Sequence, residues 1–196
     1  LPFFFRDYID RDESTFILMG QSWVDGHLPY TELWDLKPPI TYLFFAIIIY
    51  IFGKSFLAIR LVGALIVAIT AFYTYKISLT ATTKKVGFWA AIGCVALQSM
   101  FGSLQGVMSE HICMVFFMPA LYILIKKNNA FWYAAAGLLM GLSLMTKLNL
   151  GYIVLLLGFY ILYIHFKERA YGKGVWRSML FGLGILTVIF MTFLPY

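Results

Sequence analysis

Long apolar runs separated by short polar stretches dominate the chain from residue 56 onward. The runs cover residues 56–80, 86–106, 109–125, 130–146, 148–166 and 175–195. Most are close to the roughly 20 residues that a helix needs to cross the hydrocarbon core of a bilayer. They lack the alternation of period two that marks the strands of a membrane barrel. The pattern therefore predicts six transmembrane helices within residues 56–196.

The composition supports the same class of protein. Apolar residues make up 62% of the chain and charged residues 12%, whereas about a quarter of the residues in a soluble domain are charged. We therefore expect an all-α polytopic membrane protein, with residues 1–196 forming a single transmembrane domain of a longer chain. Residues 1–5 resemble the end of an earlier apolar segment, so we expect a preceding transmembrane helix and further sequence after residue 196.

Basic residues gather between the apolar runs, at Lys84-Lys85, at Lys126-Lys127 and within residues 167–177. Two apolar runs separate each cluster from the next, so all three clusters face the same side of the membrane. The positive-inside bias makes that side cytoplasmic. The net charge of +6 is thus explained by loop anchoring, and no nucleic-acid partner is predicted. The connections near residues 105–110 and 147–149 then face outward.

Residues 40–53 leave two alternatives, because fourteen residues are few for a membrane span. If they cross the bilayer, the acidic segment 6–37 is cytoplasmic and lies opposite Glu110. If they lie in the interface or re-enter, that segment shares the outer side with Glu110. We favour the second alternative, because Pro38-Pro39 begins the run and its length suits an interfacial helix. Residues 6–55 are then an outer loop with short interfacial helices.

The chain contains nine acidic residues, and seven of them precede residue 36. Of the other two, Glu168 sits in a basic loop, where we expect a local charge partner. Glu110 lies at the outer mouth of two helices. It either caps the helix that begins at Ser109, or is a functional carboxylate that converges with Asp12 or Glu13.

A functional Glu110 could orient a base, or bind a metal together with His111. A single Glu-His pair supplies too few ligands for a metal site. No cofactor is therefore predicted, and a divalent metal stays an open alternative.

Three cations lie inside or beside the apolar layer on the acidic face: Lys37, Arg60 and Lys147. Each alone could extend its charged end to the membrane surface. Together they suit a phosphate or pyrophosphate at that surface.

Several short motifs occur in a fixed order over about 140 residues. They are Arg11-Asp12-Glu13, Gly26-His27-Leu28-Pro29-Tyr30, Lys37-Pro38-Pro39, Gly53, Arg60 and Thr146-Lys147. In this order they resemble the first outer loop and a later helix end of the GT-C glycosyltransferases. The most similar branch is that of the dolichyl-phosphate-mannose protein mannosyltransferases and lipid A aminoarabinose transferases.

The resemblance implies an inverting transfer of a sugar from a polyprenyl-phosphate donor to a lipid, glycan or protein acceptor. It implies that Asp12, of the pair Asp12-Glu13, is the base, supported by Glu110. It also implies that Lys37 holds the donor phosphate, with Arg60 and Lys147 as helpers. We expect Tyr30 and His111 to complete the substrate-binding set.

The chemistry fits these residue types. A carboxylate can take the proton of an acceptor hydroxyl as it attacks the anomeric carbon, and a cation can stabilise the leaving phosphate. The resemblance also places the loop on the non-cytoplasmic face. We expect an integral protein of the bacterial inner membrane whose active site faces the periplasm.

Some positions depart from the pattern of the family. Thr15 and Phe16 stand where some relatives have Tyr and Arg, and Leu36 stands where aminoarabinose transferases have Glu. A catalytically silent scaffold with the same fold is therefore an alternative. A transporter with charged residues along a pathway is another, although no convincing internal repeat supports it.

Overall fold

The computed structural model describes residues 10–100 and 106–196, and over these residues the chain forms helices and no strands. The helices are α1 (Arg11–Val24), α2 (Pro39–Phe52), α3 (Phe56–Ser78), α4 (Lys84–Ser99), α5 (Ser109–Lys126), α6 (Ala130–Leu144), the short 3₁₀ helix η2 (Leu148–Leu150), α7 (Gly151–Lys167) and α8 (Tyr171–Phe193). The predicted all-helical fold is confirmed.

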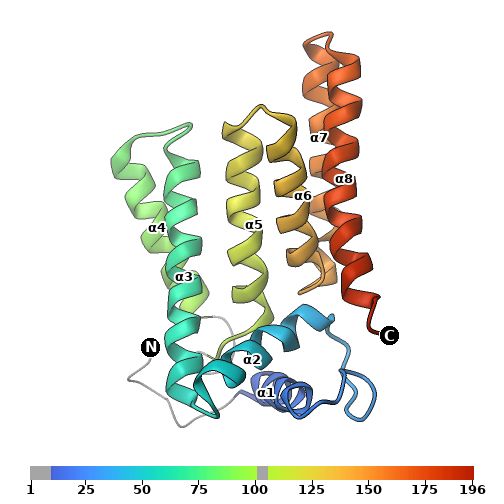
Figure 1. The fold of residues 1–196 in the computed structure, drawn as a ribbon. Coiled ribbons are helices and arrows are strands. Elements are labelled where there is room, and N and C mark those ends of the chain that lie inside the picture. The colour runs from blue at the N-terminus through green and yellow to red at the C-terminus, as the bar shows by residue number, and fades with distance from the viewer. Residues whose placement is uncertain (1–9, 101–105) are drawn as a thin grey trace.

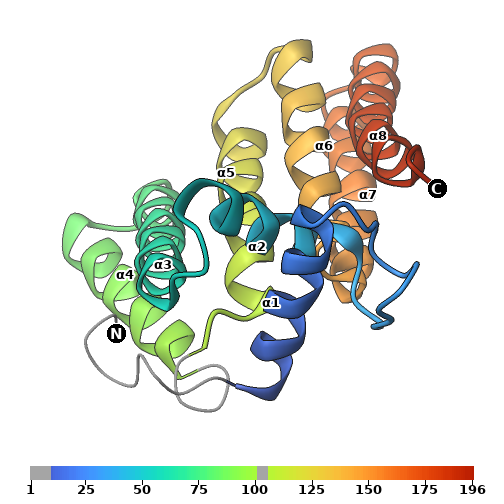
Figure 2. The same cartoon turned by 60° about the horizontal axis from the view of Figure 1, so that its bottom comes forward.

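Helices α3 to α8 run side by side, and α1 and α2 lie across one end of this bundle (Figures 1 and 2). Helix α2 begins at Pro39, which suits a first helical position because its missing N–H would have no partner there. It ends at Phe52, and the cap residue Gly53 that follows has a φ of 70°, which favours glycine. Helix α1 approaches α2 closely at Gly20, where an added Cβ would lie 2.9 Å from the Ala46 backbone nitrogen.

The three connections that carry the basic clusters all lie at the end of the bundle opposite α1 and α2 (Figure 1). They join α3 to α4, α5 to α6, and α7 to α8. The prediction that the clusters share one side agrees with this arrangement. Their cytoplasmic position stays a prediction.

Four of the described segments are long and apolar enough to cross a membrane: Phe56–Ser78, Ser109–Lys126, Leu148–Lys167 and Tyr171–Phe193. Helix α6 has 15 residues, which at 1.5 Å per residue gives about 22 Å. Helix α4 has 16, and the predicted run 86–106 continues into residues 101–105, outside the described residues. The prediction of six spans therefore stays a prediction. The large exposed side chains of α7, such as Leu155, Leu156 and Phe159, suit a surface that faces lipid.

Two packed clusters hold the helices together. The first joins α1, α2, α3 and α5 through Phe16, Tyr42, Phe45, Ile59 and Ile112. The second joins α5, α6, α7 and α8. Within it, α6 and α8 nearly touch, since a Cβ added at Gly137 would lie 2.2 Å from the carbonyl oxygen of Phe181. Small residues at such crossings are typical of membrane helix pairs.

Candidate active site

Glu13 and Arg60 form an ion pair in the interior, where α1 meets α3. The Glu13 side chain is 1% exposed and that of Arg60 is 4%. Both guanidinium Nη atoms donate to the carboxylate, one of them at 2.7 Å. The backbone N–H of Val107 donates to Glu13 Oε1 at 2.8 Å. The pair thus ties α1 both to α3 and to the connection before α5.

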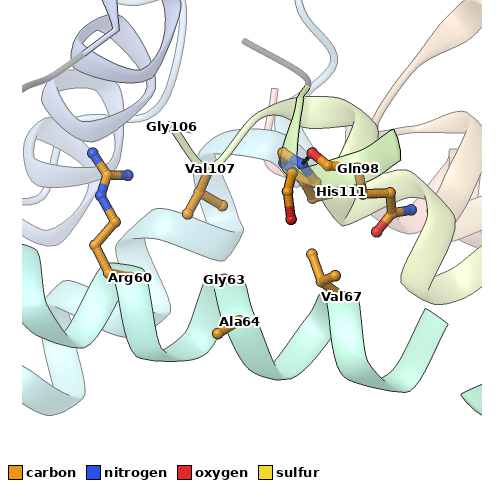
Figure 3. Close-up of a pocket in the computed structure, with 9 residues that line it drawn as sticks. Arg60, Gly63, Ala64, Val67, Gln98, Gly106, Val107 and His111 are labelled. Carbon is orange, nitrogen blue, oxygen red and sulfur yellow. Dashed lines mark hydrogen bonds between the residues drawn. The ribbon is translucent and has the colours of Figure 1, made fainter. Parts of the chain in front are cut away.

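Gly106 allows this connection to lie directly on the carboxylate. An added Cβ would lie 2.9 Å from Glu13 Oε2, so a side chain at this position would push the connection away. The small pocket beside the pair is lined by residues such as Arg60, Gly63, Gln98 and His111 (Figure 3). Its volume of about 20 Å³ is close to the space of one water molecule. A sugar does not fit there.

Asp12 has a different environment from its neighbour. Successive helix residues are rotated by about 100°, so Asp12 is exposed while Glu13 is buried. Its backbone N–H is held by the N-cap Asp10, whose Oδ1 accepts at 2.9 Å. Among residues 10–100 and 106–196, no cation forms an ion pair with the Asp12 carboxylate. Of the two carboxylates, Asp12 is the one available to a substrate.

Lys37 lines a pocket of about 330 Å³ together with Tyr30, Trp34, Met145, Leu148 and Phe193, among others. In the part of the chain that the structure describes, no carboxylate pairs with the Lys37 ammonium. The Tyr30 hydroxyl donates to the Lys37 carbonyl at 2.5 Å. The Tyr42 hydroxyl lies 2.9 Å from Asp35 Oδ2 and 3.1 Å from the same carbonyl. Two tyrosines thus fix the backbone from which Lys37 extends.

Tyr30 itself adopts an unusual backbone conformation, with φ at 69°. Left-handed conformations are uncommon for a bulky residue and concentrate at functional sites. Burial, followed by the nearby Tyr196, raises the pKa of the Tyr30 hydroxyl. Tyr30 therefore keeps its proton and remains a hydrogen-bond donor to the Lys37 carbonyl.

Glu110 and Lys147 form a second ion pair, between the first turn of α5 and the residue before η2. The Ser109 hydroxyl donates to Glu110 Oε2 at 3.1 Å. The side chains are 27% and 23% exposed, so this pair is far less enclosed than that of Glu13. It lies in the wall of a pocket of about 590 Å³ between α3, α4, α5 and residues 147–150.

His111 lies in the packed interior, 5% exposed. The Met108 N–H donates to its Nδ1 at 2.9 Å, and its Nε2 lies 2.8 Å from the carbonyl of Gln98. Nε2 therefore carries the proton, and the lone pair on Nδ1 already accepts the hydrogen bond from the Met108 N–H. This geometry does not suit a metal ligand, and the described residues contain no group of three His, Cys, Asp or Glu side chains that could hold a metal. The alternative of a Glu110–His111 metal pair finds no support.

The start of α2 is joined to the end of α6 by two hydrogen bonds. The Ile40 N–H donates to the Met145 carbonyl at 3.2 Å, and the buried Thr41 hydroxyl donates to the Thr146 carbonyl at 3.0 Å. Lys37 and Lys147 therefore flank this joint. Residues 145–150 form part of the wall of both larger pockets, the one that contains Lys37 and the one that contains Lys147.

The predicted site residues thus fall into three groups. Lys37, Tyr30, Lys147 and Glu110 surround the joint, whereas Glu13, Arg60 and His111 are packed inside and Asp12 is exposed on α1. Sequence analysis missed the residues that build the joint and fix Lys37: Asp35, Thr41, Tyr42 and Met145. The Thr146-Lys147 motif gave a signal for the joint, because its threonine belongs to it.

Comparison with known proteins gives one family. The sequence model of the family described as dolichyl-phosphate-mannose-protein mannosyltransferase matches residues 36–196. The match includes Lys37, Arg60, Glu110, His111 and Lys147, whereas Asp12, Glu13 and Tyr30 precede it. No curated protein and no solved structure gives a match.

Proposed function

The chain belongs to the dolichyl-phosphate-mannose-protein mannosyltransferase family, and on that premise we propose that it transfers a sugar from a polyprenyl-phosphate donor, with inversion, to a lipid, glycan or protein acceptor. The match supports a membrane glycosyltransferase of the GT-C type.

The observation that carries the proposal is the environment of Lys37. Lys37 lines a pocket whose other walls are mostly aromatic and apolar, and two tyrosine hydroxyls hold its backbone. A cation fixed in this way can stabilise the negative charge that develops on a leaving phosphate. Lys147, on the far side of the joint, is the second cation for the same phosphate. Arg60 is already held by Glu13 and acts by positioning α1.

Asp12 is the proposed base. Its carboxylate takes the proton of the acceptor hydroxyl. The hydroxyl oxygen then attacks the anomeric carbon with a lone pair, from the side opposite the phosphate. The bond between that carbon and the phosphate oxygen breaks, and its electron pair leaves with the polyprenyl phosphate. Glu13 is a positioning residue, because its pair with Arg60 fixes the helix turn that carries Asp12.

We propose that the end of the bundle with α1 and α2 faces the non-cytoplasmic side, in a bacterial inner membrane the periplasm. The support is its separation from the basic connections, which gather at the opposite end (Figure 1). Basic loops favour the cytoplasmic side. Helix α2 then lies in the interface, so a lipid-linked donor can reach the pocket of Lys37 from the bilayer.

The test measures sugar transfer from radiolabelled polyprenyl-phosphate sugar in membrane vesicles that contain the protein. Lys37→Ala should lower the rate by about 10²–10³-fold, as expected when a group that stabilises developing charge is removed. Lys54→Ala is the matched control, because Lys54 is an exposed lysine at the other end of α2, and its rate should equal that of the wild type. Equal rates for both variants would contradict the role of Lys37. No transfer by the wild type would favour the silent scaffold.

A further inference from the structure

The largest pocket near the candidate site combines a charged wall with an apolar interior. Its volume is about 590 Å³, and it lies between α3, α4, α5 and residues 147–150. Lys147, Glu110 and Asn149 provide polar groups, whereas Ala90, Leu97, Met114 and Met118 provide apolar surface. Ligand pockets in proteins commonly have such a size and lining.

The volume and lining point to an amphipathic ligand with an anionic head. A polar sugar alone would leave most of the apolar lining uncovered. A free phosphate would use Lys147 but leave the apolar lining uncovered. An isoprenoid phosphate matches both parts, because its chain covers the apolar lining and its head reaches the ammonium of Lys147.

Glu110 has a specific part in this arrangement. A partly buried cation beside an apolar pocket is stabilised by a partner of opposite charge, and Glu110 is that partner while the pocket holds no anion. The polyprenyl phosphate that leaves the sugar is a phosphate monoester and carries more negative charge than a carboxylate, so it can take over Lys147 and release Glu110. The carboxylate then competes with the ligand for one ammonium.

Resting on the proposed function, we infer that the isoprenoid chain of the donor occupies the pocket between α3, α4 and α5, and that Glu110 is an internal placeholder that the lipid phosphate displaces from Lys147. This gives Glu110 a role in binding in place of one in proton transfer. It also gives the lipid chain a protein-lined site next to the joint that Lys37 and Lys147 flank.

Gly93 offers a way to fill the pocket without disturbing the fold. It lines the pocket, and an added Cβ would meet no atom within 4 Å. Gly158 is a matched control on α7. It lines a different pocket, between α7 and α8, and its Cβ would also meet no atom within 4 Å. Leucine at either position replaces a helix glycine by a better helix former, so both variants should fold.

The first measurement is equilibrium binding of a radiolabelled long-chain polyprenyl phosphate to the protein in nanodiscs. Gly93→Leu should weaken binding by about tenfold or more, since a blocked apolar pocket loses much of the chain's contact. Gly158→Leu should leave it unchanged. Dimethylallyl phosphate, which has the head group but almost no chain, should bind both variants alike. Equal binding of the long-chain ligand to both variants overturns the assignment of the pocket.

The second measurement tests the placeholder. Glu110→Gln should tighten binding of the polyprenyl phosphate about threefold to tenfold, because the competing charge is gone. It should leave binding of the corresponding polyprenol, which lacks the phosphate, unchanged. Lys147→Ala should weaken binding of the polyprenyl phosphate and leave binding of the polyprenol unchanged. Weaker phosphate binding in Glu110→Gln overturns the placeholder.

The outcomes separate this inference from the proposed function. If the wild type binds no long-chain polyprenyl phosphate, the proposed donor is wrong as well. If it binds that lipid but Gly93→Leu has no effect, only the pocket assignment is wrong. If an excess of anionic phospholipid displaces the bound polyprenyl phosphate as effectively as unlabelled polyprenyl phosphate does, the pocket is a site for bilayer lipid. That result would overturn the choice of an isoprenoid ligand.

Discussion

The Glu13 carboxylate is joined to Arg60 through both guanidinium Nη atoms, one of them at 2.7 Å, in a site that is almost closed to solvent. The two residues lie 47 positions apart in the chain. Their contact fixes α1 on α3, and with α1 the position of Asp12. The adjacent carboxylates of the Asp-Glu motif therefore have different environments: one is enclosed and paired, and the other is exposed.

Glu13→Gln should destabilise the protein by about 3–5 kcal/mol, because it leaves the Arg60 charge buried without its carboxylate. Thermal unfolding of the purified protein in detergent measures the change. Glu32→Gln is the control, since Glu32 is exposed and pairs with His27, and exposed pairs contribute about 0–1 kcal/mol. If both variants unfold at the same temperature, Glu13 does not stabilise the contact of α1 with α3.

Gly106→Ala should lower stability by about 1–3 kcal/mol, the usual cost of forcing an extra carbon into a packed site. The added Cβ would lie 2.9 Å from Glu13 Oε2. Gly182→Ala is the comparison, because its Cβ would meet nothing within 4 Å on α8, and alanine is the better helix former. The two unfolding temperatures should move in opposite directions. A rise in both would mean that the connection yields freely at Gly106.

The sequence predicted the helices well because they depend on local pattern. The run 56–80 became Phe56–Ser78, and the run 109–125 became Ser109–Lys126. Pro38-Pro39 and Gly53 mark the limits of α2, because proline suits the first turn of a helix and glycine suits the left-handed residue that follows the last turn. Helix α8 begins at Tyr171, four residues before the predicted run, because Gly172, Lys173 and Gly174 extend the helix without adding a large apolar side chain.

The pairing of charges was beyond the sequence. Arg60 and Lys147 were both expected to serve a phosphate, yet each is paired with a carboxylate, Glu13 and Glu110 respectively. Partners 47 and 37 residues apart meet only because of how the helices pack. His111 was expected near the substrate, but its hydrogen bonds with Met108 and Gln98 depend on where α4 ends. Of the three predicted cations, Lys37 is the one that forms no ion pair with a carboxylate among the described residues. Its ammonium therefore remains available to a phosphate.

Tyr30→Phe should raise the KM for the lipid-linked donor by up to about tenfold, because a hydrogen bond of about 0.5–1.5 kcal/mol that fixes the Lys37 backbone is lost. The maximum rate should change little, since Lys37 itself remains. Tyr50→Phe is the control, because Tyr50 is 80% exposed on α2. Sugar-transfer kinetics give both constants. An unchanged KM in Tyr30→Phe would show that Lys37 needs no such support.

Sidedness can be measured with single cysteines in sealed, oriented vesicles. Starting from a variant without Cys94 and Cys113, Glu32→Cys and Asn128→Cys should be labelled by an impermeant maleimide from opposite sides. Asn128 directly follows Lys126-Lys127 in the α5–α6 connection, and Glu32 lies between α1 and α2. If both are labelled from one side, residues 40–53 cross the bilayer and the proposed active site is divided.

The most direct measurement of the central claim is the rate at which labelled sugar leaves its polyprenyl phosphate in vesicles that carry the Asp12→Asn variant. Asparagine keeps the size of the side chain but cannot accept the acceptor proton at neutral pH, so the rate should fall by about 10²–10⁴-fold. Asp25→Asn, at the other end of α1, should keep the wild-type rate. Wild-type transfer by Asp12→Asn would contradict the account of this carboxylate as the base.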